Sequence, residues 1–112
     1  MKILFTVKDN SWDSVIDPRF GRTEGFFIYD EASDNTEYLD NSEAASQSHG
    51  AGPLAAQKIF DLKPDVLITG NGPGGKASAV LSNMNLEIYM GAGGMTVKEA
   101  YEAYKNGSLH KM

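Results

Sequence analysis

The sequence predicts a three-layer α/β/α domain built on a mixed sheet of five strands with three helices. In the second half of the chain, short apolar runs alternate with amphipathic helical patterns, which is typical of right-handed crossovers between parallel strands. The first half has two short runs separated by a turn, the pattern of an antiparallel hairpin. With 112 residues there is room for one hydrophobic core, so residues 1–112 are expected to form a single domain.

Strands in the first half are predicted where short apolar runs end in turn residues. Residues 3–7 form such a run before Lys8, which indicates a central strand buried on both faces. Residues 26–29 form a second strand, and residues 36–39 form a weaker third strand after a turn. Between the first two strands, residues 9–23 are expected to be a long loop, a kind of segment that is often functional.

Helices are predicted from apolar positions three and four residues apart. Residues 54–62 carry this pattern, with Pro53 in the first turn. After a buried strand at 66–69, a second helix is predicted by the stripe of Ala77, Val80, Leu81 and Met84.

The last part of the chain has the clearest helix signals. A strand is expected at 86–90, and Thr96 with Glu99 makes a capping box that starts a final helix ending at Gly107. His110, near the end of the sequence, is expected to lie in a frayed tail.

Composition excludes several classes of function. Ten basic against fifteen acidic residues give a net charge of −5, which argues against binding to nucleic acid or to an anionic membrane. Cysteine is absent, so no disulfide, thiolate-held metal or cysteine nucleophile is possible. No signal peptide or membrane span is recognisable, and a cytoplasmic location is expected.

Three loops are expected at one edge of the sheet. Ligands of such sheets bind outside the carboxyl ends of the parallel strands. This rule brings together residues 8–23, 70–76 and 91–96.

The glycine-rich loop before the second helix resembles two phosphate-binding patterns without completing either. Residues 70–76 fit G-x-x-x-x-G-K, but Ala77 stands where magnesium needs a hydroxyl. Residues 72–77 fit G-x-G-x-x-A, yet the expected acid is missing near Met90. What remains is an anion site made of backbone N–H groups, or a tight strand-to-helix turn with no ligand. The glycines of residues 91–94 repeat the arrangement.

Cationic side chains are also expected at this edge. Arg19 and Arg22 lie in the long loop, and Lys8 and Lys76 lie close to it, so each is either a ligand contact or a surface charge without a role. His49 could serve as a metal ligand or as an acid-base group. No catalytic arrangement is recognisable, so binding is favoured over catalysis.

Taken in order, the motifs resemble the dinitrogenase iron-molybdenum cofactor biosynthesis family over nearly the whole chain. They are Arg19-Phe20-Gly21-Arg22, the strand from Phe26 to Asp30, His49-Gly50-Ala51-Gly52, the run from Asp65 to Gly70 with Gly72-Pro73 and Lys76-Ala77, Ile88 to Gly91, Thr96 to Ala100, Tyr104 and Gly107-Ser108-Leu109.

The resemblance implies a ribonuclease-H-like fold with a five-stranded mixed sheet. It also implies that the chain holds an iron-molybdenum cofactor precursor, or a molybdenum-copper or molybdenum-iron sulfide cluster, and delivers it to a receiving protein. Many cofactor-handling relatives have a histidine before the Phe-Gly pair, whereas this chain has Arg19. Electrostatic capture by Arg19 and Arg22 is then expected, with His49 as the one internal imidazole for a metal.

The leading hypothesis is a non-enzymatic carrier of an anionic metal-sulfur cofactor. Two alternatives stay open: a nucleotide- or phosphate-binding domain that uses residues 70–76, and a regulatory module that binds a partner through the acidic strands. The expected cofactor-binding residues are Arg19, Phe20, Gly21, Arg22, His49, Gly70, Gly72, Gly74, Gly75, Lys76, Gly91 and Gly93, with His49 as the metal ligand.

Overall fold

The computed structural model describes residues 1–112 and shows one sheet of six strands with four helices. The α/β class is confirmed, but the predicted numbers of five strands and three helices are wrong by one each. The strands are β1 (Lys2–Val7), β2 (Gly25–Asp30), β3 (Asn35–Asp40), β4 (Val66–Ile68), β5 (Glu87–Met90) and β6 (His110–Lys111). The helices are α1 (Ser42–Ala45), α2 (Ala51–Phe60), α3 (Gly75–Leu81) and α4 (Val97–Lys105).

The sheet is mixed, with the strand order β3-β2-β1-β4-β5-β6. The central strands β1, β4 and β5 run parallel to one another. On one side, β1, β2 and β3 form an antiparallel meander, and on the other side β6 pairs antiparallel with β5. The predicted central position of the first strand and the early hairpin are therefore confirmed.

The two additional elements are too short to leave a sequence signal. In β6, His110 pairs with Met90 across the sheet, so the end of the chain is an edge strand rather than a frayed tail. The single turn α1 follows β3 directly, and the Ser42 N–H donates to the Asp40 carboxylate at 2.8 Å. Neither segment is long enough to show a hydrophobic period.

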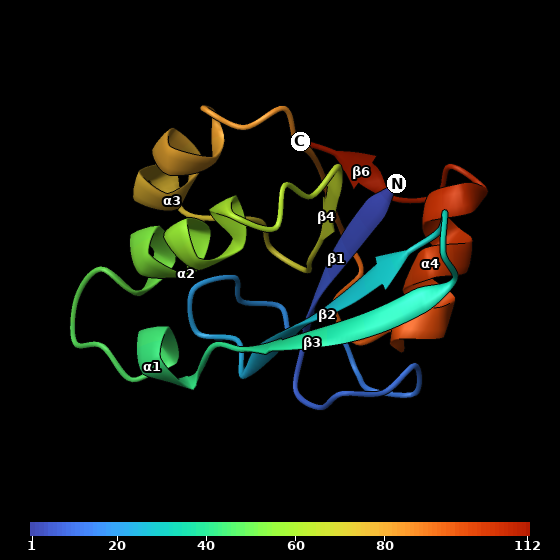
Figure 1. The fold of residues 1–112 in the computed structure, drawn as a ribbon, viewed down its shortest axis with the longest axis horizontal. Coiled ribbons are helices and arrows are strands. Elements are labelled where there is room, and N and C mark those ends of the chain that lie inside the picture. The colour runs from blue at the N-terminus through green and yellow to red at the C-terminus, as the bar shows by residue number, and fades with distance from the viewer.

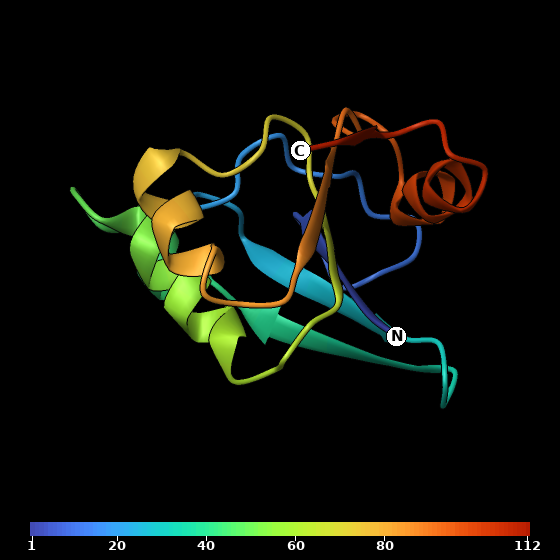
Figure 2. The same cartoon turned by 90° about the horizontal axis from the view of Figure 1, so that it is seen from above.

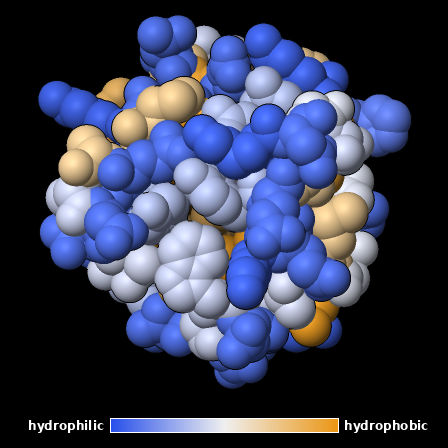
Figure 3. Space-filling model, turned by 90° about the vertical axis from the view of Figure 1, so that its right-hand side faces the viewer, coloured by the Kyte–Doolittle hydropathy of each residue, from blue (hydrophilic) through white to orange (hydrophobic).

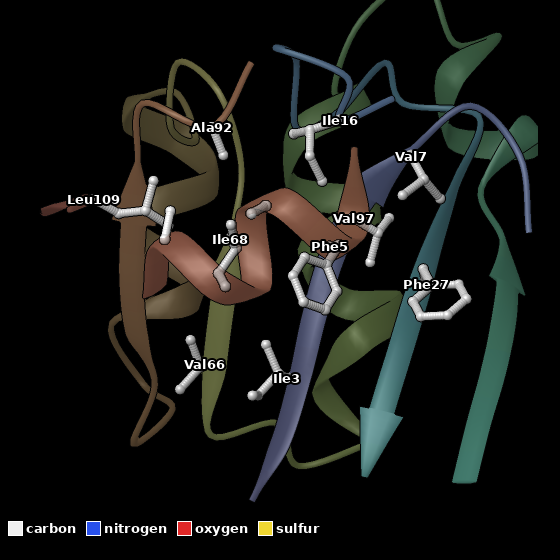
Figure 4. Packing of buried hydrophobic residues seen from close by; sticks show 12 residues of the cluster. Ile3, Phe5, Val7, Ile16, Phe27, Val66, Ile68, Ala92, Val97 and Leu109 are labelled. Carbon is white, nitrogen blue, oxygen red and sulfur yellow. The ribbon is translucent and has the colours of Figure 1, made fainter. Parts of the chain in front are cut away.

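Helices cover both faces of the sheet, which gives three layers. Figures 1 and 2 show α1, α2 and α3 on one side of the sheet and α4 on the other. Each side has its own cluster of twelve buried apolar residues. Figure 4 shows the cluster beneath α4, where Phe5, Val66 and Ile68 rise from the strands toward the helix. Ile16 and Ala92 reach the same cluster from loops beyond the strand ends.

The surface on the α4 side of the fold is mainly polar (Figure 3). None of the four helices has the length and apolar character needed to cross a lipid bilayer. On the side where α4 lies, Figure 3 shows hydrophilic side chains with small, separate apolar patches among them. This face has no continuous apolar surface of the kind that marks many docking sites.

Candidate functional site

The structure brings three loops together at the carboxyl ends of the parallel strands, as the sheet rule predicted. The N–H of Asn71, after β4, donates to the carbonyl of Pro18 in the long loop at 2.8 Å. The N–H of Gly91, after β5, donates to the carbonyl of Gly70 at 2.9 Å. Backbone hydrogen bonds therefore hold residues from all three loops together at this edge of the sheet.

Two of the predicted glycines allow backbones to pack closely. A Cβ on Gly70 would lie 2.5 Å from the Cα of Pro18. A Cβ on Gly21 would lie 2.6 Å from the backbone nitrogen of Gly52, at the start of α2. Since real Cβ atoms do not approach backbone atoms so closely, both positions require glycine for packing, whatever the site binds.

Beside the packed loops lies an open cavity of about 400 Å³. Three segments surround it: the end of the long loop, the first turn of α2 and the first turn of α3. Its lining residues are Gly21, Arg22, Gly50, Ala51, Gly52, Pro53, Gly74, Gly75, Lys76 and Ala77. Five of the predicted cofactor-binding residues thus line one cavity, namely Gly21, Arg22, Gly74, Gly75 and Lys76.

The two helices that open onto this cavity begin without a side-chain cap. Gly50 is the N-cap of α2 and Gly74 is the N-cap of α3, and neither has a side chain that can accept a first-turn N–H. In contrast, the Thr96 side chain of α4 accepts the N–H of Glu99 in the predicted capping box. Helix starts with free N–H groups carry partial positive charge, so the cavity wall is suited to an anion.

Glycine also leaves room in this wall. A Cβ on Gly50, Gly74 or Gly75 would meet nothing within 4 Å. These three glycines differ from Gly21 and Gly70 because the space beside them is open. A bulky ligand could approach the backbone here without a clash.

The predicted cations have different surroundings. The Lys76 side chain is exposed and makes no hydrogen bond or ion pair. The Arg22 guanidinium donates to the carbonyls of Ala45, at 2.8 Å, and Gln47, which ties the cavity rim to the end of α1. Neither partner is a carboxylate and Arg22 makes no ion pair, so its side chain keeps a net positive charge beside the cavity.

Other predicted site residues lie outside the cavity lining. Arg19 is paired with the buried carboxylate of Asp17 at 3.1 Å, and Phe20 is buried with its ring 5.6 Å from the ring of Phe26. His49 is exposed next to the N-cap of α2, and no group of three or more histidine, aspartate or glutamate side chains could hold a metal. Gly72 lies beside Met90 at the end of β5 and Gly91 lies beside His110 of β6, whereas Gly93 packs against Gly70 and Pro18.

Sequence reasoning missed the polar side chains that hold the cavity loops. The fully buried Asn41 donates from Nδ2 to the carbonyls of Gly21, at 3.2 Å, and Thr23, at 2.9 Å. Its Oδ1 is buried and has no partner. Beneath the loops, the hydroxyls of Thr6 and Thr69 lie 2.9 Å apart. These residues belong to no sequence motif, so their role is visible only in the folded structure.

Comparison with known proteins places this architecture in a family. The dinitrogenase iron-molybdenum cofactor family matches residues 1–107. The chain belongs to this family. It is 34% identical to the apo form of the orange protein from Desulfovibrio gigas, with a TM-score of 0.92, over 99% of this chain and 92% of that one.

A second solved structure supports the same placement. The chain is 30% identical to a NifB-like protein from Thermotoga assigned to the DUF35 family, with a TM-score of 0.83. That alignment covers 98% of this chain and 91% of the other. No curated protein sequence matches the chain. Family and structural relatives together support a role connected with binding of iron-molybdenum-cofactor-type metal clusters.

Proposed function

We propose that this member of the dinitrogenase iron-molybdenum cofactor family is a non-enzymatic carrier of an anionic metal-sulfur cluster. The cluster would occupy the cavity between Arg22, the start of α2 and the start of α3. The cargo would be an iron-molybdenum cofactor precursor or a molybdenum-containing sulfide cluster with copper or iron. A receiving protein would take the cluster from this open site.

The observation that carries the proposal is the chemistry of the cavity wall. Two uncapped helix starts, the side chain of Lys76 and the guanidinium of Arg22 meet around one cavity of about 400 Å³. All of these groups are hydrogen-bond donors or cations, which fits the sulfide surface of a cluster with net negative charge. The volume lies within the usual range of small-ligand pockets, about 300 to 1,000 Å³.

The donor set favours retention by charge over coordination. The chain has no cysteine, and the cavity lining includes no histidine or carboxylate. A cluster that already has its full set of sulfide ligands needs no protein ligand, only compensation of its charge. Such a cargo can also be released to a partner without breaking a metal-protein bond, which suits a carrier.

A reconstitution experiment tests the proposal. The protein is incubated anaerobically with molybdate, copper or iron, and sulfide, then desalted and analysed for metal, sulfide and visible absorption. Stoichiometric molybdenum with charge-transfer bands is the expected result. A colourless protein without metal would contradict the proposal.

A pair of matched variants locates the site. Lys76→Gln removes a cation from the cavity and Lys98→Gln removes an exposed cation from α4, so net charge changes equally. Lys76→Gln should lower cluster retention, more strongly at low salt than at high salt, because salt screens the lost interaction. Equal retention by both variants would place the cluster elsewhere.

The second candidate, a phosphate or nucleotide site, is favoured by the glycine run that precedes Lys76. One observation argues against magnesium-nucleotide binding. Ala77 stands where the pattern requires a hydroxyl-bearing residue, and it is buried with its Cβ facing Gly52. Calorimetry with ATP and magnesium separates the two candidates. If ATP with magnesium gives a heat of binding, and Lys76→Gln abolishes it, nucleotide binding would be favoured over cluster binding at this site.

A further inference from the structure

A group of soft donor atoms lies at the end of β5, outside the cavity described above. Met90 is the last residue of β5 and pairs with His110 of β6. Met112 follows two residues after His110, and its N–H donates to the carbonyl of Ile88 at 2.8 Å. Paired residues of an antiparallel ladder, and residues two apart on one strand, project to the same face of a sheet. The side chains of Met90, His110 and Met112 therefore share one face.

The loop after β4 passes beside both sulfur atoms. A Cβ on Gly72 would lie 2.6 Å from the Sδ of Met90 and 4.0 Å from the Sδ of Met112. Gly72 has a φ of 83°, a left-handed conformation that also favours glycine. Both thioethers thus lie beside the same segment of backbone, at a residue that has no side chain of its own.

The imidazole lies at the same end of the strand. The Cδ2 of His110 is 3.3 Å from the position of a Cβ on Gly91, the residue after Met90. The side chains of His110 and Met112 are exposed and that of Met90 is partly exposed, so a metal ion can reach all three. The one charged neighbour on β6, Lys111, is paired with Glu87 at 3.4 Å, and alternation along the strand directs it to the opposite face.

We propose that Met90, His110 and Met112 form a binding site for a soft monovalent metal ion, with Cu(I) as the natural occupant. Thioethers are soft, neutral ligands that select Cu(I), and imidazole is also a good copper ligand. Two sulfurs and one nitrogen supply a three-coordinate site without any carboxylate or thiolate. Methionine has three rotatable bonds, so the two thioethers can close on an ion with little movement of the strands.

This site is separate from the proposed cluster cavity. None of the three ligands lines that cavity, whose nearest wall on this loop begins at Gly74. The two sites differ in charge as well, because one has cations and N–H donors and the other has neutral acceptors. A failure of cluster binding would leave this proposal intact, and the reverse also holds.

The test uses Cu(I) alone, without molybdate or sulfide. Anaerobic competition with a chromogenic Cu(I) chelator gives the affinity and stoichiometry, and Ag(I), which is stable in air, serves as the probe for NMR. We expect one ion per chain and movement of the methyl signals of Met90 and Met112 and of the ring signals of His110. Signals of Met1, Met84 and Met95 should stay in place.

Variants assign the ligands. Loss of even an outer-shell partner typically weakens metal binding about 10- to 100-fold, so Met112→Leu, Met90→Leu and His110→Asn should each weaken binding at least tenfold. Met84→Leu and Met95→Leu are the matched controls, because both methionines pack against the core clusters. Met112→Leu changes an exposed side chain, so it tests the site without risk to the fold.

Specific results would overturn the proposal. They are unchanged affinity in a Met90→Leu/Met112→Leu double variant that keeps the wild-type NMR fingerprint, or Ag(I)-induced shifts confined to other methionines or to His49. Lys76→Gln should leave Cu(I) affinity unchanged, which separates this test from the test of the cluster cavity.

Discussion

The guanidinium of Arg19 donates two parallel hydrogen bonds to the carboxylate of Asp17. Nε donates to Oδ1 at 3.1 Å and Nη2 donates to Oδ2 at 3.1 Å. The Asp17 side chain is fully buried, whereas that of Arg19 is 56% exposed. A buried carboxylate is costly unless it is paired. The main role of the Arg19 guanidinium is therefore to stabilise the fold of the long loop by compensating the charge of Asp17.

This pairing predicts that Arg19→Ala acts mainly on stability. The change leaves Asp17 buried with the N–H of residue 19 as its remaining donor from this loop. Breaking a fully buried pair costs about 3 to 5 kcal/mol, and the exposure of Arg19 reduces the expected loss to about 1 to 3 kcal/mol. Urea unfolding measures it. Lys8→Ala, in the same loop, should change the free energy of unfolding by less than about 0.5 kcal/mol, and equal effects would contradict the structural role of Arg19.

Glycines at the site should divide into two classes when they are replaced by alanine. Gly21→Ala would place a Cβ 2.6 Å from the backbone of Gly52, which should cost about 1 to 3 kcal/mol through overpacking. Gly75→Ala places a methyl group in open space in the first turn of α3, which should stabilise by about 0.4 to 1 kcal/mol.

Cluster retention should respond differently from stability at Gly75. Its methyl group would occupy the wall of the cavity, so Gly75→Ala should retain less cluster although the protein is more stable. Thermal unfolding and metal analysis on the same samples measure both effects. Full retention in Gly75→Ala would show that the cluster does not approach this backbone.

Much of the fold could be predicted from local patterns. The apolar run of residues 3–7 is the central β1, and the Thr96-Glu99 capping box starts α4 as expected. The pairing of β6 with β5 could not be predicted, because a strand of two residues is too short to show a hydrophobic pattern. Ile16 is fully buried within a segment whose turn residues indicate only a loop.

The same distinction applies to the site. The glycine run and Lys76 could be placed at the sheet edge because strand order alone puts them there. The roles of Arg19 and Gly21 depend on partners, Asp17 and Gly52, that no sequence period connects to them. Phe20 shows the same limit, since its motif position indicates a ligand contact but its ring is packed in the core beside α2.

The capping box of α4 gives a direct stability prediction. The Thr96 hydroxyl accepts the N–H of Glu99 at 3.1 Å, and the Glu99 carboxylate accepts the N–H of Thr96 at 2.9 Å. Thr96→Ala should lower the free energy of unfolding by about 1 kcal/mol, the usual cost of losing an N-cap. Thr96→Ser keeps the hydroxyl and should recover most of the loss. Equal destabilisation by both variants would mean that the methyl group, not the cap, matters.

Tyr101 and Glu31 predict a change of stability with pH. The Tyr101 hydroxyl donates to the Glu31 carboxylate at 2.5 Å. This hydrogen bond raises the pKa of Tyr101 to about 12 and lowers the pKa of Glu31 below its ordinary value. Because the folded state holds the tyrosine proton more tightly than the unfolded chain, the stabilisation is complete below pH about 10 and is lost as the pH rises toward about 12.

The Glu31 side of the pair acts in the opposite direction. A lowered carboxyl pKa stabilises the fold above the unfolded value of about 4.3, and that stabilisation is lost as the pH falls through the folded pKa. Tyr101→Phe should therefore cost about 1 kcal/mol near neutral pH, and its difference from the wild type should shrink in both acid and strong alkali. Urea unfolding across this pH range measures the effect. Tyr104→Phe removes a hydroxyl on the same helix that does not contact Glu31, so its stability difference from the wild type should not change in acid. If both variants show the same change in acid, the effect does not come from the hydrogen bond to Glu31.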